Sequence, residues 1–149
     1  MEEVLRHGEG EAQISRRTYK GISVSLAILF AVVGLIFLFA PNAVLLLFNS
    51  ISRSFGMNQA PEQSFNFYSI LAVAYMYLVT VLAYLMFMNP GEARFVWLLI
   101  NAKAVSSLLS FIFFIVVGSY LICLANGIVD GMIAFGLVIL LKKVRIAAE

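Results

Sequence analysis

The segment from residue 95 to residue 141 constrains this chain most, because its 47 residues are almost continuously apolar. A bilayer core about 30 Å thick needs about 20 helical residues to cross it. The segment therefore predicts two membrane-spanning helices joined by a short turn. It also contains Lys103 and Asp130, the only charges within any long apolar segment of the chain. Charges at membrane depth are costly and usually face a partner or a cavity.

The composition agrees with a membrane protein. Of the 149 residues, 62% are hydrophobic and 12% are charged, whereas ordinary soluble domains carry about 25% charged residues. The length predicts a single membrane domain over residues 1–149. The one cysteine, Cys123, excludes an intrachain disulfide and a thiolate metal cluster. A net charge of +2 is too small to suggest nucleic acid as a partner.

Four apolar segments predict an all-α integral membrane protein, a four-transmembrane-helix bundle. The predicted spans cover residues 21–40, 65–88, 95–117 and 121–141, with a polar N-terminal segment 1–20, an outer loop 49–64 and a basic tail 142–149. Residues 43–48 are apolar but too few to span a bilayer. Because proline is tolerated at the first position of a helix, Pro41 predicts a short interfacial helix after the first span.

The basic residues predict the orientation. Ten lysines and arginines are present, of which eight flank the spans on the side of both termini, Arg53 lies on the other side and Lys103 lies within a span. Basic residues concentrate on the cytoplasmic side, so we expect both termini to be cytoplasmic. The outline of a first span ending in Ala-Pro and a tight final hairpin is similar to that of many small prokaryotic membrane proteins. This resemblance implies the prokaryotic cytoplasmic membrane.

Two positions compete for the turn of the last hairpin. Asn126-Gly127 is the stronger turn dipeptide. A turn there leaves a last helix of about 21 Å and a third helix of about 45 Å, and both lengths fit a bilayer poorly. A turn at Gly118-Ser119-Tyr120 gives two spans of ordinary length, and we expect the chain to turn there.

With the turn near Gly118, the two charges lie at similar depths. Lys103 is about 13 Å and Asp130 about 17 Å from the cytoplasmic edge. We therefore expect an ion pair between the third and fourth spans that fixes their register. In the alternative, Lys103 extends to the cytoplasmic interface and Asp130 caps a helix near the outer surface.

The faces of these two helices favour close packing. A polar stripe on the third helix comprises Lys103, Ser106, Ser107 and Ser110, and a small-residue stripe on the fourth comprises Cys123, Gly127, Gly131 and Ala134. Gly127 and Gly131 have the GxxxG spacing that lets helix backbones approach closely. The expected register places Ser107 opposite Asp130 and Ser110 opposite Gly127.

Residues that carry catalysis or bind cofactors are scarce in the predicted spans. The only histidine, His7, lies in the polar N-terminal segment, so we expect no haem, no metal site and no other cofactor. Lys103 with Ser106 or Ser107 resembles a serine–lysine dyad, but a serine one turn from a lysine more often hydrogen-bonds its ammonium group.

We therefore expect a non-catalytic membrane protein whose partners are the lipid bilayer and other membrane subunits or copies of itself. The expected role is an accessory or scaffold subunit on a larger membrane assembly, or a self-associating bundle. The alternative is a small oligomeric transporter or channel that uses Lys103 and Asp130 as an intramembrane polar site.

Overall fold

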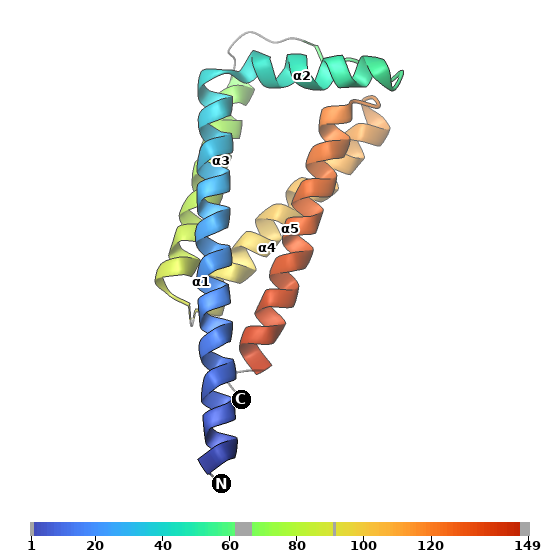
Figure 1. Cartoon of the computed structure of the whole chain (residues 1–149). Coiled ribbons are helices and arrows are strands. Elements are labelled where there is room, and N and C mark those ends of the chain that lie inside the picture. Colours follow the sequence, from blue (N-terminus) through green and yellow to red (C-terminus); the bar gives the residue numbers. More distant parts are fainter. Residues whose placement is uncertain (1, 62–66, 91, 147–149) are drawn as a thin grey trace.

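A computed structural model of the chain describes residues 2–61, 67–90 and 92–146, with side chains described for residues 16–61, 69–90 and 92–142. The described residues form five helices: α1 (Glu2–Phe39), α2 (Pro41–Ser54), α3 (Phe67–Met88), α4 (Ala93–Val116) and α5 (Leu121–Ile146) (Figure 1). Four of them are long and apolar enough to cross a membrane. The expected all-α four-span bundle with a shorter helix after the first span is therefore confirmed.

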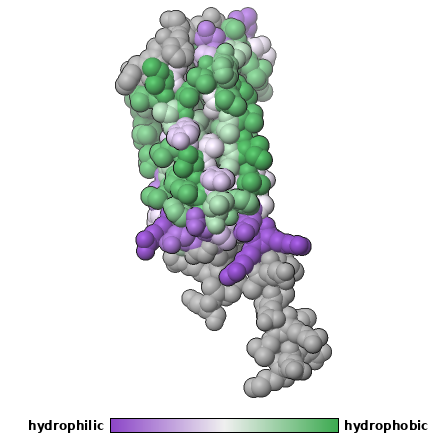
Figure 2. Space-filling model, turned by 90° about the vertical axis from the view of Figure 1, so that its left-hand side faces the viewer, coloured by the Kyte–Doolittle hydropathy of each residue, from purple (hydrophilic) through white to green (hydrophobic). Residues whose placement is uncertain are grey.

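A helix satisfies its backbone N–H and C=O groups internally, which the bilayer core requires of any spanning segment. Figure 2 shows the result on one side of the molecule, where a broad apolar band separates two hydrophilic ends. The end of the bundle where α3 and α5 end and α4 begins carries exposed basic residues: Arg16, Arg17, Lys20, Arg94 and Lys142. The opposite end carries α2 with Arg53.

Two elements are longer than the apolar pattern indicates. The polar N-terminal residues continue the first span as one helix, since α1 begins at Glu2. The helix opened by Pro41 does not stop with the apolar residues at 48 but runs to Ser54. Its polar second half is not wholly exposed, because Asn49 and Ser52 are buried. Asn49 binds Ala60 twice, accepting from its backbone N–H and donating to its carbonyl at 2.8 Å each.

The last hairpin turns between Val116 and Leu121, so Asn126 and Gly127 lie inside α5. The turn is tight: a Cβ atom on Gly118 would come within 3.1 Å of the Tyr120 ring. Tyr120 also forms an isolated parallel bridge with Asn58 from the loop after α2. The α2 segment is thereby connected to the turn of the last hairpin.

The four spans pack as two helix pairs. α1 packs along α3, and α4 packs along α5, whereas contacts between the two pairs are less extensive. Figure 1 shows α5 close to α1 near the chain termini and farther from it toward α2, which lies across that end. The close approach of α1 to α3 depends on Gly34, whose Cβ position lies 3.1 Å from Cβ of Met76.

The hydrophobic core lies in the half of the bundle that contains the termini. Its buried members are Tyr19, Ala27 and Phe30 of α1, Val79, Ala83 and Met86 of α3, Val96, Leu99 and Ile100 of α4, and Leu137 and Leu140 of α5. These residues come from the middle of α1, the start of α4 and the second halves of α3 and α5, where all four spans meet. The two intramembrane charges are next along α4 and α5, at the boundary of this core.

Candidate functional site: a polar seam between α4 and α5

The main polar feature among the described side chains is a line of residues between α4 and α5, here called the polar seam. It comprises Lys103, Ser106, Ser107 and Ser110 of α4 and Asn126 and Asp130 of α5. The structure brings Lys103 and Asp130 together, with the ammonium Nζ 2.8 Å from Oδ1 of the carboxylate. Only 1% of Lys103 and 3% of Asp130 is exposed. The two charges therefore neutralise each other inside the protein.

Two aromatic rings from the other helix pair enclose the lysine. Its ammonium group lies 4.4 Å from the ring centroid of Phe30 in α1 and 5.2 Å from that of Tyr75 in α3. The face of an aromatic ring attracts a cation, most strongly where water is excluded. Tyr75 is itself held in place, because its hydroxyl donates to the carbonyl of Ala102 at 3.0 Å. Lys103 thus links both helix pairs.

The remaining members of the seam also bind one another. The Ser107 hydroxyl donates to the Gly127 carbonyl at 2.7 Å. The Asn126 amide donates to the hydroxyl oxygen of Ser110 at 2.7 Å and more weakly to that of Ser106 at 3.4 Å. Because the Ser107 proton points to a backbone carbonyl and Lys103 bonds Asp130, this arrangement does not form the serine–lysine dyad considered above.

Small residues of α5 allow α4 and α5 to approach each other closely along the polar seam. A Cβ atom on Gly131 would lie 3.0 Å from Oγ of Ser107, and one on Gly127 would lie 3.2 Å from the Phe111 ring. Ala134, one turn further along α5, is buried. The glycines therefore act at the interface between α4 and α5, where close packing brings short polar side chains within hydrogen-bonding distance.

The register differs slightly from the one expected. Ser107 meets the backbone of Gly127 rather than Asp130, and Ser110 meets Asn126 rather than Gly127. The long Lys103 side chain reaches the carboxylate from the neighbouring turn, and Ser107 occupies the space that Gly131 leaves open. The partner of Ser107 is thus three residues from the expected one, which is less than one helical turn, and the partner of Ser110 is one residue from the expected one.

Three contributors to the site were missed at the sequence level. In the sequence, Asn126 stands out only as half of a turn dipeptide. It nevertheless precedes Asp130 by four residues and so lies on the same helix face. Phe30 and Tyr75 carry no local sequence signal for their role. Their contact with Lys103 arises only from packing between helices that are distant in sequence.

The polar seam contains few groups that could bind a ligand or take part in a reaction. Oδ2 of Asp130 is buried and has no hydrogen-bond partner, so the carboxylate is only half satisfied. No group of three or more histidine, cysteine or acidic side chains that could hold a metal ion occurs among the described residues. The geometry of the seam is that of a buried ion pair with serine and asparagine hydrogen bonds on one side of it.

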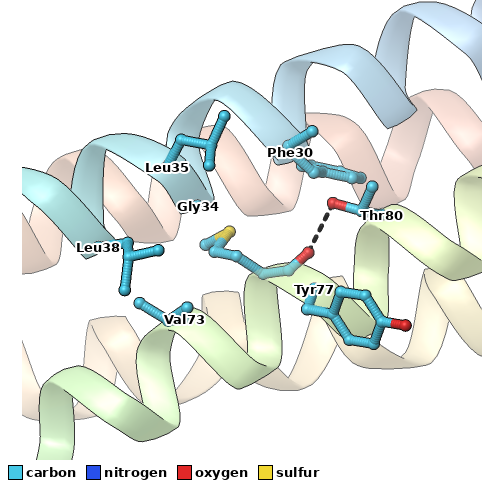
Figure 3. A pocket seen from close by; sticks show the side chains of 9 residues that line it. Phe30, Gly34, Leu35, Leu38, Val73, Tyr77 and Thr80 are labelled. Carbon is cyan, nitrogen blue, oxygen red and sulfur yellow. Dashed lines mark hydrogen bonds between the residues drawn. The ribbon is translucent and has the colours of Figure 1, made fainter.

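A second feature is an apolar hollow of about 290 Å³ on the membrane-facing side of α1 and α3. Figure 3 shows Leu35, Leu38 and Val73 around it, with Gly34 on the α1 side. Thr80 borders the hollow, but its hydroxyl donates to the Met76 carbonyl at 2.7 Å (Figure 3). The hollow therefore presents almost entirely hydrocarbon to the membrane.

The comparisons give no relative from which a role could be transferred: no protein-family model, no curated protein and no solved structure matches this chain.

Proposed function

We propose that this protein is a non-catalytic scaffold or accessory subunit, which acts by lateral association within a membrane. One observation carries the proposal. The side chains of the polar seam bind one another or the facing backbone, and the central ion pair is almost completely enclosed. An interior that is used to fix the register of its own helices leaves the outer surface as the part available to partners.

The outer surface has features that suit such contacts. Most of it is apolar, as expected next to lipid (Figure 2), but polar side chains interrupt it well inside the spans. Tyr77 of α3 is 70% exposed, and Asn101 of α4 is also exposed. Polar side chains on membrane helices commonly form hydrogen bonds across helix–helix interfaces, so these residues support association with another membrane helix.

We further propose that both termini face the cytoplasm of a prokaryotic cell. The described basic side chains, apart from Lys103 and Arg53, gather at the end of the bundle where α3 and α5 end and α4 begins, and Arg53 is the described cation near the other end. Such an asymmetry is typical of the cytoplasmic side of a membrane protein.

The alternative function, transport through the Lys103/Asp130 site, is less well supported. A transport site must be reached from both sides of the membrane, and the pair is enclosed by Phe30, Tyr75 and the surrounding helices. The orphaned Oδ2 of Asp130 is the one feature that favours it, because a buried carboxylate oxygen without a partner can accept a bond from a small polar ligand.

Purification from native membranes in a mild detergent tests the scaffold proposal. We expect the tagged protein to recover another membrane protein, or a second copy of itself, in a fixed ratio. The surface variants Tyr77→Leu and Asn101→Leu should reduce that recovery, whereas Ser25→Ala, which alters an exposed polar residue of α1, should not.

Flux measurements in liposomes test the alternative. Transport of a solute that disappears in a stable Lys103→Met/Asp130→Ala double variant would contradict the scaffold proposal. Recovery of a partner by both the wild-type protein and this double variant would support the proposal, because the buried pair would then be unnecessary for the contact.

A further inference from the structure

The exposed face of α4 carries a regular pattern that the polar seam does not use. The residues Leu98, Asn101, Val105, Leu108, Ile112 and Ile115 follow one another at alternating spacings of three and four. All six are exposed, and they lie opposite the buried face formed by Val96, Leu99, Ile100, Lys103 and Ser107. We call these six residues the α4 stripe.

The spacing of the α4 stripe is that of a helix–helix seam. A heptad repeat places contact residues at positions a and d, which are three and four residues apart. In the α4 stripe, a positions are occupied by Leu98, Val105 and Ile112, and d positions by Asn101, Leu108 and Ile115. Among parallel coiled coils, branched residues at a with leucine at d, as at Val105, Leu108 and Ile112, favour two strands. The exposed residue Ala104 beside the stripe leaves room for a second backbone.

Asn101 is the polar exception in this stripe. It lies within four residues of the middle of α4, or about 5 Å along the helix axis. One amide hydrogen is used, since Nδ2 donates to the Trp97 carbonyl at 2.8 Å. An asparagine side chain also has a second N–H and a carbonyl oxygen. Lipid tails have no donor or acceptor for these groups, whereas asparagine side chains commonly form hydrogen bonds across membrane helix interfaces.

The surface on both sides of Asn101 is hollowed. One hollow of about 480 Å³ lies between α3 and α4 and includes Asn101, Val105 and Tyr75 in its lining. Another of about 460 Å³ lies nearer the end of the helix and includes Asn101, Trp97 and Arg94. Asn101 therefore lines both hollows, which are shallow depressions into which side chains of a neighbouring helix can pack.

We infer that the α4 stripe is the contact surface of a parallel homodimer, in which Asn101 of one copy binds Asn101 of the other. A carboxamide is both donor and acceptor, so it is complementary to itself. Two copies with the same orientation in the membrane are related by a twofold axis along the membrane normal, which brings the same residue of each α4 together. The free N–H of each Asn101 then donates to the carbonyl oxygen of the other.

The charges at the end of α4 are compatible with this arrangement. Arg94 continues the spacing of the α4 stripe toward the termini, and two copies of it would approach each other. Each Arg94 is paired with Glu92 of its own chain at 3.2 Å, so that neither copy presents an isolated positive charge. The pair is largely exposed, and water therefore screens what repulsion is left.

This inference rests on the proposed function, because it names a second copy as the lateral partner. Disulfide trapping in native membranes tests it directly. In a Cys123→Ser background, single cysteines replace Leu98, Val105 and Leu108 in turn. We expect rapid disulfide-linked dimers at all three positions. Cysteines that replace Phe113 and Met132, which are as exposed as the stripe residues but lie on other faces, should form them at least several-fold more slowly.

Energy transfer between labelled copies in liposomes tests the role of Asn101. A hydrogen-bonded polar contact between membrane helices is worth about 0.6–2 kcal/mol, so Asn101→Leu should weaken dimerisation about threefold to thirtyfold. Asn101→Gln should retain most of the association, and Ser25→Ala should leave it unchanged. Equal trapping at Phe113 and Leu108, or a dimer affinity unaltered by Asn101→Leu, would overturn the inference.

The two proposals fail in different ways. A monomer in liposomes that still recovers another membrane protein from native membranes would overturn the homodimer and leave the scaffold role intact. A dimer trapped through the α4 stripe whose double variant Lys103→Met/Asp130→Ala loses a transport activity would overturn the scaffold role and leave the homodimer intact.

Discussion

We expect Lys103→Met to destabilise the protein more than Asp130→Ala, although each change breaks the same ion pair. In Lys103→Met the carboxylate loses the one partner of Oδ1, while Oδ2 has none to begin with. An uncompensated buried charge of this kind costs about 3–5 kcal/mol. In Asp130→Ala the ammonium group keeps the rings of Phe30 and Tyr75. A contact between a cation and a ring is worth about 0.5–2 kcal/mol, so with two rings this variant should lose about 1–4 kcal/mol less than Lys103→Met.

The double variant Lys103→Met/Asp130→Ala removes both charges. Replacement of a whole buried pair by apolar groups is often close to neutral. The methionine fills most of the lysine volume, and its sulfur can pack against the same two rings. We therefore expect the double variant to be at least about 3 kcal/mol more stable than the sum of the two single losses predicts, because Lys103→Met alone loses about 3–5 kcal/mol. This coupling is at the upper end of the range for residues in direct contact.

Equilibrium unfolding in mixed micelles, followed by far-ultraviolet circular dichroism as a denaturing detergent is added, measures these differences. Met132→Ala is a suitable control, because Met132 is 70% exposed on α5 and should change stability by less than about 0.5 kcal/mol. Strictly additive losses would show that the two charges do not interact. A greater loss in Asp130→Ala than in Lys103→Met would refute the role assigned to the rings.

Three further predictions concern other parts of the fold. Gly131→Ala should destabilise the protein by about 1–3 kcal/mol in the same unfolding assay, because its Cβ would lie 3.0 Å from Oγ of Ser107. Gly136→Ala, with no atom within 4 Å of the new Cβ, should be neutral or gain up to about 1 kcal/mol, and equal effects of the two changes would contradict the packing described. Asn49→Ala removes both bonds to Ala60 and should speed limited proteolysis of the loop after α2; an unchanged cleavage rate would mean that these bonds do not hold the loop. In a Cys123→Ser background, a cysteine at Asn58 should react with an impermeant maleimide in intact cells, whereas cysteines at Ser15 and Lys143 should react only after permeabilisation, and the reverse pattern would show the opposite orientation.

Bilayer thickness made much of this fold predictable. The requirement for about 20 helical residues per span placed the turn of the last hairpin near Gly118 despite the stronger local turn signal at Asn126-Gly127. The length of α2 was less accessible, because its second half is polar. Those residues are helical in part because Asn49 and Ser52 are buried against the protein. Such a contact cannot be predicted from the local sequence.

The polar seam was predictable where its members lie on adjacent helices of one hairpin. Lys103 and Asp130 are close because a short turn between α4 and α5 fixes their relative depth. The spacing of the serines indicated which face of α4 packs against α5. The register could be estimated only to within a fraction of a helical turn, since it depends on how Ser107 fits against Gly131. The rings of Phe30 and Tyr75 could not be assigned, because many apolar residues of α1 and α3 have the same local pattern.

The position of the ion pair also affects how the chain enters the membrane during synthesis. A lysine near the middle of a spanning helix adds about 2.5–3.5 kcal/mol to the cost of leaving the translocation channel for lipid. Lys103 precedes Asp130 by 27 residues, so α4 reaches the membrane before the helix that carries its neutralising partner. Phe30 and Tyr75 belong to helices that are already made by then. They give the ammonium group an aromatic environment inside the nascent bundle until α5 arrives and brings the carboxylate with it.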